Sequence, residues 1–149
     1  MYEIPKQQVP VVLYLANGET IRGKVFVAEE LVSPAGNPDI DEFLNRHAPR
    51  FIPFQSEAGA WRLVNRGQVM YIETTQDDEE VRARTTLGPR ALVLYFAHEV
   101  ILYGTVYPTR EEAARVSDIL NESDNFLTIY RQGQKIIVNR SQVIYANAN

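Results

Sequence analysis

The chain has 149 residues, of which 45% are hydrophobic and 23% charged, a composition typical of a folded globular protein. Its 19 acidic and 15 basic residues give a calculated isoelectric point of about 5.2, which argues against DNA and anionic membranes as partners and disfavours RNA, because such binding needs concentrated positive charge. The sequence has no cysteine, which excludes disulfides, zinc–thiolate sites and thiol catalysis.

Two segments of the sequence occur twice. Val12–Phe26 aligns without a gap on Val93–Tyr107, and Leu63–Tyr71 aligns on Ile137–Tyr145. Both copies keep the two segments in the same order, which indicates an internal duplication.

The duplication predicts the domain organisation. We expect a first repeat over residues 9–73, a linker over residues 74–90 and a second repeat over residues 91–147. The linker holds the acidic run Asp77–Glu80, which is typical of a solvated connection. Modules of this size are marginal alone, so we expect the copies to pack on one another or on further subunits.

Each repeat begins with a predicted hairpin. In the first, the apolar and β-branched runs Val11–Ala16 and Thr20–Val27 flank Asn17-Gly18. Asn-Gly between two such runs predicts a type I′ turn, in which both central residues have positive φ. In the second copy His98-Glu99 takes this place, so that hairpin needs a different turn or a longer loop.

A short helix is predicted in the middle of each repeat. In the second copy, Thr109 and Glu112 have the spacing of a capping box and precede apolar residues at helical spacing. This pattern predicts a helix from about Arg110 to Asn121. The first copy has a shorter counterpart at Asp39–Arg46.

Three further strands complete each repeat. They are expected at Phe51–Gln55, Trp61–Val64 and Gln68–Glu73 in the first copy, and at Phe126–Arg131, Lys135–Val138 and Gln142–Ala146 in the second. Pro53 predicts an edge position or a bulge for its strand, because proline cannot donate to a ladder. Trp61 is expected in the core. The predicted fold class is mainly β (α+β), with two tandem repeats of the order β-β-α-β-β-β.

Five short, bent strands per repeat suggest an SH3-like small barrel, and three segments resemble the Sm-like family. Leu15–Val25 resembles the first Sm motif, Asp41–Asn45 is similar to its Asp-x-x-apolar-Asn ending, and Val64–Tyr71 resembles the second motif with its Arg-Gly. The second copy has Arg140-Ser141 in that last place. The resemblance implies tandem Sm-like barrels, with fourth and fifth strands that pair with neighbours and Asn and Arg-Gly positions that bind single-stranded RNA.

The candidate ligand-binding residues are the Asn-Arg pairs that recur in both copies, together with one asparagine from each predicted helix. They are Asn45, Asn65, Arg66, Asn121, Asn139 and Arg140. In one interpretation each guanidinium binds a phosphate, a carboxylate or a base edge. In the other, each turn asparagine makes an Asx-turn and each arginine pairs with a helix carboxylate such as Asp41 or Asp118.

Tyr14 and Tyr95 are candidate interface residues, because they occupy matched positions on first strands that are apolar on both faces. A strand with two apolar faces needs cover on both sides. Either the helix of the same copy covers the tyrosine side, or the other copy or another subunit does.

No recognisable catalytic constellation is present. His47 and His98 are the histidines of the chain, and neither has a matched partner that would suggest a triad or a metal site. We therefore expect a non-enzymatic module, without cofactor or metal, that works by self-association or by binding a protein partner. The alternative is an Sm-like binder of single-stranded RNA or a nucleotide.

Neither end carries a run of signal-peptide type, and no apolar stretch approaches the roughly 18 residues that span a bilayer. We therefore expect a cytoplasmic protein that is not inserted in a membrane.

Overall fold

The computed structural model describes residues 5–33, 36–74 and 87–148. Ten antiparallel strands dominate them, so the predicted mainly β fold class is confirmed. The strands are β1 (Lys6–Leu15), β2 (Thr20–Ala28), β3 (Phe51–Ser56), β4 (Trp61–Asn65), β5 (Val69–Thr74), β6 (Arg90–Tyr95), β7 (Ile101–Val106), β8 (Phe126–Arg131), β9 (Gln134–Asn139) and β10 (Tyr145–Ala148).

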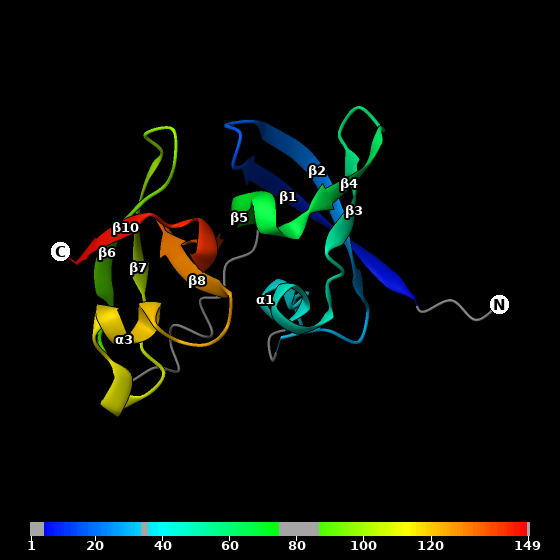
Figure 1. Ribbon diagram of the computed structural model, residues 1–149. Helices are drawn as coiled ribbons and strands as arrows, with labels where there is room; N and C mark the ends of the chain where they lie inside the picture. The colour runs from blue at the N-terminus through cyan, green and yellow to red at the C-terminus, as the bar shows by residue number, and fades with distance from the viewer. Residues whose placement is uncertain (1–4, 34–35, 75–86, 149) are drawn as a thin grey trace.

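All ten strands belong to one open sheet, in the order β10-β6-β7-β8-β9-β5-β1-β2-β3-β4. Figure 1 shows β6, β7, β8 and β10 in one half of the molecule and β1 to β5 in the other. The first half contributes β5-β1-β2-β3-β4 and the second half contributes β10-β6-β7-β8-β9, so both halves have the same strand order. The sheet is not closed into the two separate barrels expected from the sequence. The two halves share a ladder because β5 pairs with β1 on one side and with β9 on the other.

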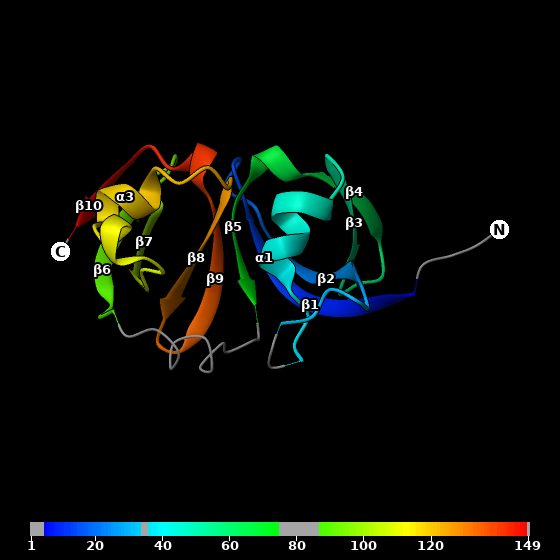
Figure 2. The same cartoon turned by 90° about the horizontal axis from the view of Figure 1, so that it is seen from below.

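The ladder between β5 and β9 lies where the two halves meet (Figure 2). Its register pairs Tyr71 with Val138, Ile72 with Ile137 and Glu73 with Ile136. The strands β4 and β10 lie at the two ends of the same sheet and have no neighbour on their outer sides among the described strands.

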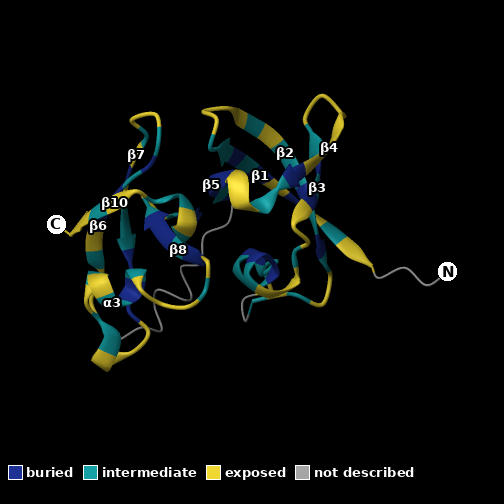
Figure 3. Ribbon diagram, in the orientation of Figure 1, coloured by how far each residue is buried: buried dark blue, intermediate teal, exposed yellow. Residues whose placement is uncertain are grey.

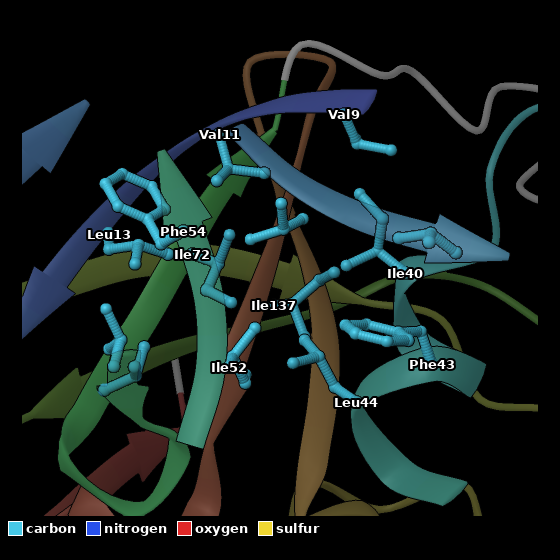
Figure 4. Packing of buried hydrophobic residues seen from close by; sticks show 14 of the residues in the cluster. Val9, Val11, Leu13, Ile40, Phe43, Leu44, Ile52, Phe54, Ile72 and Ile137 are labelled. Carbon is cyan, nitrogen blue, oxygen red and sulfur yellow. The ribbon is translucent and has the colours of Figure 1, made fainter. Parts of the chain in front are cut away.

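Two hydrophobic clusters lie on opposite faces of this central ladder. Successive side chains of a strand point to opposite faces, and accordingly Ile137 belongs to one cluster while Ile136 and Val138 belong to the other. The first cluster is built mainly from the first half (Figure 4). The second is built mainly from the second half but includes Met70 and Tyr71 of β5. Each half therefore completes the core of the other.

The helices are short. The first half has α1 (Ile40–Glu42), continued by the π-helical η1 (Phe43–His47), close to the predicted Asp39–Arg46. Asp39 caps α1 by accepting a hydrogen bond from the N–H of Glu42 at 3.1 Å.

In the second half the predicted helix from Arg110 to Asn121 is wrong in its extent. The chain forms a 3-10 turn, η3 (Glu111–Ala113), and then a separate helix, α3 (Val116–Leu120). Arg115 is extended between them, with ψ of 153°. The Asp118 carboxylate accepts hydrogen bonds from the N–H and the guanidinium of Arg115, which fixes the start of α3 after that residue.

The two predicted hairpins form, but the turn with two consecutive residues of positive φ lies in the second hairpin and not in the first. The type I′ geometry predicted for Asn17-Gly18 is absent, because Gly18 has a φ of 91° while Asn17 is not among the described residues of positive φ. Instead His98 and Glu99 have φ of 61° and 60°, and Val100 donates to the Ala97 carbonyl. Positive φ at two consecutive non-glycine residues is uncommon, so this turn could not be predicted from its residues.

The second glycine of the motif at Leu15–Val25 stands where another strand comes very close. A Cβ on Gly23 would overlap the carbonyl oxygen of Gln55 in β3. At the matched Gly104 a Cβ would lie 2.7 Å from Cδ1 of Ile129 in β8. Both second strands therefore need glycine because the third strand packs against their backbone.

Pro53 was predicted to lie in an edge strand or at a bulge, but β3 is an interior strand, and its ladders with β2 and β4 have no register shift. The ladder between β2 and β3 involves only Phe54–Ser56 on the β3 side. Pro53 precedes this ladder, so the missing N–H costs no bond to β2.

The short 3-10 turns η2 (Arg66–Gln68) and η4 (Arg140–Gln142) connect the fourth to the fifth strand of each half. Residues 75–86 of the predicted linker, with its acidic run, lie outside the described residues. No helix in the described part of the chain has the length and apolar character needed to cross a membrane.

Candidate functional site

Each turn asparagine binds its own turn. The Asn65 side chain accepts a hydrogen bond from the N–H of Gly67 at 3.0 Å, and the Asn139 side chain accepts one from the N–H of Ser141 at 3.1 Å. Both residues therefore make Asx-turns.

Each turn arginine reaches the C-terminal end of the helix in its own half. Arg66 Nη1 donates to the carbonyl oxygen of Ala48, directly after η1, at 2.7 Å. Arg140 Nη2 donates to the carbonyl oxygen of Ile119 in α3 at 2.9 Å. The last carbonyls of a helix lack partners within the helix, and a cation near them is favourable. The arginine therefore has a structural role in both halves.

The helix carboxylates that the sequence suggested as partners of these arginines bind elsewhere. Asp118 pairs with Arg115 at 3.0 Å, and this pair lowers the pKa of Asp118 and raises that of Arg115. Asp41 of α1 pairs with the buried Lys135 of β9 and accepts a hydrogen bond from Thr128 of β8. Asp41 thus joins the two halves.

Arg140 is enclosed more fully than a ligand-binding arginine on an open turn. Its side chain is 12% exposed, and burial lowers its pKa. It also donates to the carbonyl oxygen of Asp124 and lies 3.8 Å from the Glu122 carboxylate. These contacts hold the loop after α3 on the end of β9.

Asn45 and Asn121 occupy matched positions but make different contacts. Asn45 accepts a hydrogen bond from the N–H of Phe126 at 2.8 Å and donates to the carbonyl of the same residue at 3.2 Å. It therefore clamps η1 of the first half to the start of β8. Asn121 is exposed and donates to the carbonyl oxygen of Ser117 in its own helix at 2.7 Å.

Asn139 also crosses between the halves. Its amide nitrogen donates to the carbonyl of Val69 at 2.9 Å and contacts the carbonyl of Gly67 at 3.4 Å. Gln142 donates to the same Gly67 carbonyl at 2.7 Å. Asn139 is fully buried, and a buried amide must have such partners. The turn of the second half is therefore bonded to the turn of the first.

Tyr14 lies at the contact between the halves. Its ring stacks on Tyr71 with centroids 4.3 Å apart, and both rings pack with the cluster of the second half. Its hydroxyl donates to Glu73 Oε2 at 2.8 Å. Burial and this hydrogen bond raise the pKa of Tyr14 to about 12. The cover on the tyrosine face comes from the second half and not from α1, whose buried residues belong to the first cluster.

Tyr95 repeats this arrangement at the outer end of the sheet. It stacks on Tyr145 of β10 with centroids 4.3 Å apart, and Asn147 donates to its hydroxyl at 3.4 Å. Tyr145 is exposed, so this tyrosine pair has no covering half of the kind that Tyr14 and Tyr71 have.

Aligned positions differ in exposure between the central contact and the two edges of the sheet. The pairs, with the exposed fraction of each residue, are Ile137 (0%) and Leu63 (70%), Phe126 (4%) and Phe51 (48%), Met70 (2%) and Ile144 (64%), and Tyr71 (6%) and Tyr145 (56%). Trp61 of β4, expected in the core, is 62% exposed and stacks on Phe26. Figure 3 shows this contrast between the buried centre of the sheet and its exposed outer strands.

A pocket of about 400 Å³ lies beside the first Asn-Arg turn. It is lined by Arg50, Phe51, Asn65, Arg66, Gly67 and Asn125. Two cations and a half-exposed aromatic ring surround it, a combination that suits a phosphate with an adjoining base.

The six predicted ligand-binding residues do not form one site. Asn65 and Arg66 line the pocket just described, whereas Asn45 and Arg140 line a separate pocket of about 450 Å³ between α1 and the second half. Asn139 is buried between the turns, and Asn121 is exposed on α3. Within the described residues, no three acidic or histidine side chains gather in a way that could hold a metal ion.

Sequence reasoning missed Arg50 and the exposed apolar side chains of the two edges. Leu63, Ile144 and Tyr145 each look like core residues, because their aligned partners are equally apolar. The alignment of the two copies could have identified these residues. When an apolar residue is buried in one copy, the aligned apolar residue of the other copy also needs a surface that covers it.

Comparison of the chain with models of known protein families, with curated proteins and with solved structures finds no match.

Proposed function

We propose that this protein is a non-enzymatic assembly module, built from two Sm-like five-stranded halves, that joins other polypeptide chains through the two edges of its sheet. The identical strand order of the two halves supports a duplicated small module. The Asn-Arg turns and the matched glycines Gly23 and Gly104 support the resemblance to Sm-like proteins.

The observation that carries the proposal is the apolar character of both edges. Leu63 and Trp61 on β4, and Ile144 and Tyr145 on or next to β10, are all more than half exposed. Soluble proteins protect edge strands with charges, prolines or covering segments, because unpaired backbone groups bind other strands. Both edges here combine such backbone groups with apolar side chains, which suits an added strand.

Burial of these side chains would contribute favourably to the free energy of binding. Complete burial of a leucine or isoleucine side chain contributes roughly 1.5–3 kcal/mol. An added strand would cover Leu63 at one edge or Ile144 at the other, together with a neighbouring aromatic ring.

The proposal is tested with a double variant, Leu63→Arg with Ile144→Arg, which places a charge at each edge. Both side chains are exposed, so the isolated fold should tolerate the changes. We expect the wild-type chain to occur in an assembly, either alone in solution or when isolated from cells under mild conditions, and the double variant to be recovered as a single chain. The measurement is light scattering coupled to gel filtration, with mass spectrometry of the components.

Tyr103→Arg is the matched control, because Tyr103 is 60% exposed but lies on the interior strand β7. This variant should assemble like the wild type. A wild-type protein that is a single chain in both preparations would contradict the proposal.

A second candidate function is binding of single-stranded RNA or a nucleotide at the pocket beside Asn65 and Arg66. The pocket lining of Arg50, Arg66 and the half-exposed Phe51 favours it. Its test is the binding of a fluorescent oligouridine at low salt to the wild type and to Arg50→Glu, with Arg22→Glu as a control for the same charge change on β2. Binding that is lost only in Arg50→Glu would support this function, and equal binding by all three would exclude it.

A further inference from the structure

We propose that the chain occupying each edge is a second copy of this protein, joined head to tail, with β10 of one copy paired to β4 of the next in the register of the central β5–β9 ladder. This inference rests on the proposed assembly function and names its partner. The partner follows from the central contact, in which a fourth and a fifth strand of this same sequence already pair.

The sequence alignment transfers the register directly. Tyr71 pairs with Val138 and Ile72 pairs with Ile137 in the central ladder. The aligned residues are Tyr145 and Ala146 on β10, and Val64 and Leu63 on β4. Pairing Tyr145 with Val64 and Ala146 with Leu63 of the next copy would therefore repeat the central ladder.

Burial supports this pairing. The edge residues that are exposed, Leu63, Phe51, Ile144 and Tyr145, are aligned with residues that the central contact buries. A head-to-tail contact would cover all four together, two from each copy. An unrelated strand added to one edge would give no reason for both edges to be exposed at matched positions.

The asparagines that cross the central contact have counterparts at the edges. Asn139 donates to the Val69 carbonyl, and the corresponding donor and acceptor are Asn65 of the next copy and the carbonyl of Val143. Asn65 makes the same turn bond as Asn139, so its side chain is held in the same way.

The helix clamp has a counterpart too. Asn45 binds both backbone groups of Phe126. The corresponding pair is Asn121 and the backbone of Phe51 in the next copy. Asn121 is exposed, and Phe51 is half exposed. In this pairing, the aligned residues Asn45 and Asn121 would both bind the backbone of a neighbouring strand.

The charged contacts of the centre are not repeated at the edges, which would keep the two contacts distinct. The pair Asp41 and Lys135 aligns with Ser117 and Trp61. A second half therefore cannot take the place of the first half beside β9 without leaving the buried Lys135 without the Asp41 carboxylate, which is strongly unfavourable. Copies would add in one order, and a head-to-tail contact of this type closes into a ring or continues as a filament.

Complementation of two single variants tests the head-to-tail pairing. Leu63→Arg blocks β4 but leaves β10 intact, and Ile144→Arg blocks β10 but leaves β4 intact. We expect each purified variant to be a single chain, and an equimolar mixture to form a complex of twice that mass and no larger. The wild type should form larger species whose mass reaches a plateau for a ring or grows with concentration for a filament.

Cysteine pairs test the register, since the natural chain has no cysteine. Chains carrying Leu63→Cys and chains carrying Ala146→Cys should form a mixed disulfide on mild oxidation, because facing residues of paired strands have Cα atoms within the roughly 4.4–6.8 Å that a disulfide spans. Replacing the first by Tyr103→Cys, on the interior strand β7, should give no such product.

The outcomes separate this inference from the proposed function. A variant mixture that stays at the mass of single chains, or Ile144→Arg chains that associate with each other, would overturn the head-to-tail pairing. If the wild type is then recovered from cells bound to a different polypeptide, and the double arginine variant is not, the assembly function stands and only the self-pairing fails. If no assembly is recovered, both fail.

Discussion

The central contact and the outer edges of the sheet are made from aligned residues, but one is covered and the other is not. Ile137 is buried in the first cluster, while the aligned Leu63 is exposed on β4. The same module therefore provides a core residue in one place and a surface residue in the other. Under the proposed assembly, these exposed edges are the contact surfaces for a further chain.

The comparison also separates structural from binding roles of the Asn-Arg turns. Arg66 and Arg140 both bind carbonyls at the end of a helix, and this shared contact is reason enough for an arginine in each half. Asn139 adds a bond across the halves. In the proposed head-to-tail pairing, Asn65 would make the equivalent bond to another copy.

Core truncation should give the largest difference between matched positions. Ile137→Ala should lower the free energy of unfolding by about 3 kcal/mol, because it leaves a cavity between the two halves. Leu63→Ala should change it by less than about 0.5 kcal/mol in the single chain, because the side chain is exposed. Urea unfolding at low protein concentration measures both, and similar losses would contradict the contrast.

Removal of the charged contact between the halves should have the next largest effect. Asp41→Ala should cost about 2–3 kcal/mol, because Lys135 would remain buried without its carboxylate. The aligned change Ser117→Ala should cost no more than about 0.5 kcal/mol. Thermal unfolding at neutral pH measures the two, and equal effects would show that the pair does not hold the halves together.

Replacement of the two turn asparagines should lower the free energy of unfolding by amounts that differ less than in the two cases above. Asn139→Ala should cost about 2 kcal/mol in the single chain, because both a turn N–H and the Val69 carbonyl lose their partner. Asn65→Ala should cost about 1 kcal/mol, from the turn bond alone. At concentrations where the wild type associates, Asn65→Ala should also weaken association, as measured by sedimentation velocity. Unchanged association would count against the proposed bond to Val143.

The smallest expected effect is the contribution of Tyr14 to the loss of folding stability at alkaline pH. Burial and Glu73 raise its pKa from 10.0 to about 12, so the folded chain keeps this proton where the unfolded chain loses it. The resulting stabilisation is complete below pH 10 and is lost as the pH rises through about 12. Tyr14→Phe should cost about 1 kcal/mol at neutral pH and flatten the fall in stability above pH 10. An unchanged alkaline slope would contradict this assignment.

The local elements of the fold were predictable from the sequence because each depends on neighbouring residues. The strand Phe126–Arg131 was predicted at its observed bounds, and Asp39–Arg46 contains most of α1 and η1. The helix after Arg110 was predicted too long, because the bond from Asp118 to Arg115 starts α3 late. A capping pattern in the sequence does not show which of several polar residues will cap.

The resemblance implied that fourth and fifth strands pair with neighbours, but the residues did not show that β5 pairs with β9 of the same chain, because that pairing depends on the fit of two surfaces that are distant in the sequence. Trp61 was placed in the core for the same reason, since an aromatic residue on an edge strand and one on a central strand look alike in sequence. Of the six predicted ligand-binding residues, Asn65 and Arg66 line the pocket beside the first turn, whereas Arg50 in the same pocket was missed. Asn45 and Asn139 connect the halves, which only the packed halves can show.

Hydrogen–deuterium exchange at low and high protein concentration shows whether the edges pair between copies, because it reports backbone hydrogen bonding strand by strand. We expect amides 71–73 and 136–138 of the central ladder to be protected at every concentration. Amides 62–64 of β4 and 145–147 of β10 should gain protection together as the concentration rises. If both edges exchange equally fast at all concentrations while the central ladder stays protected, the edges do not pair between copies and the account is wrong.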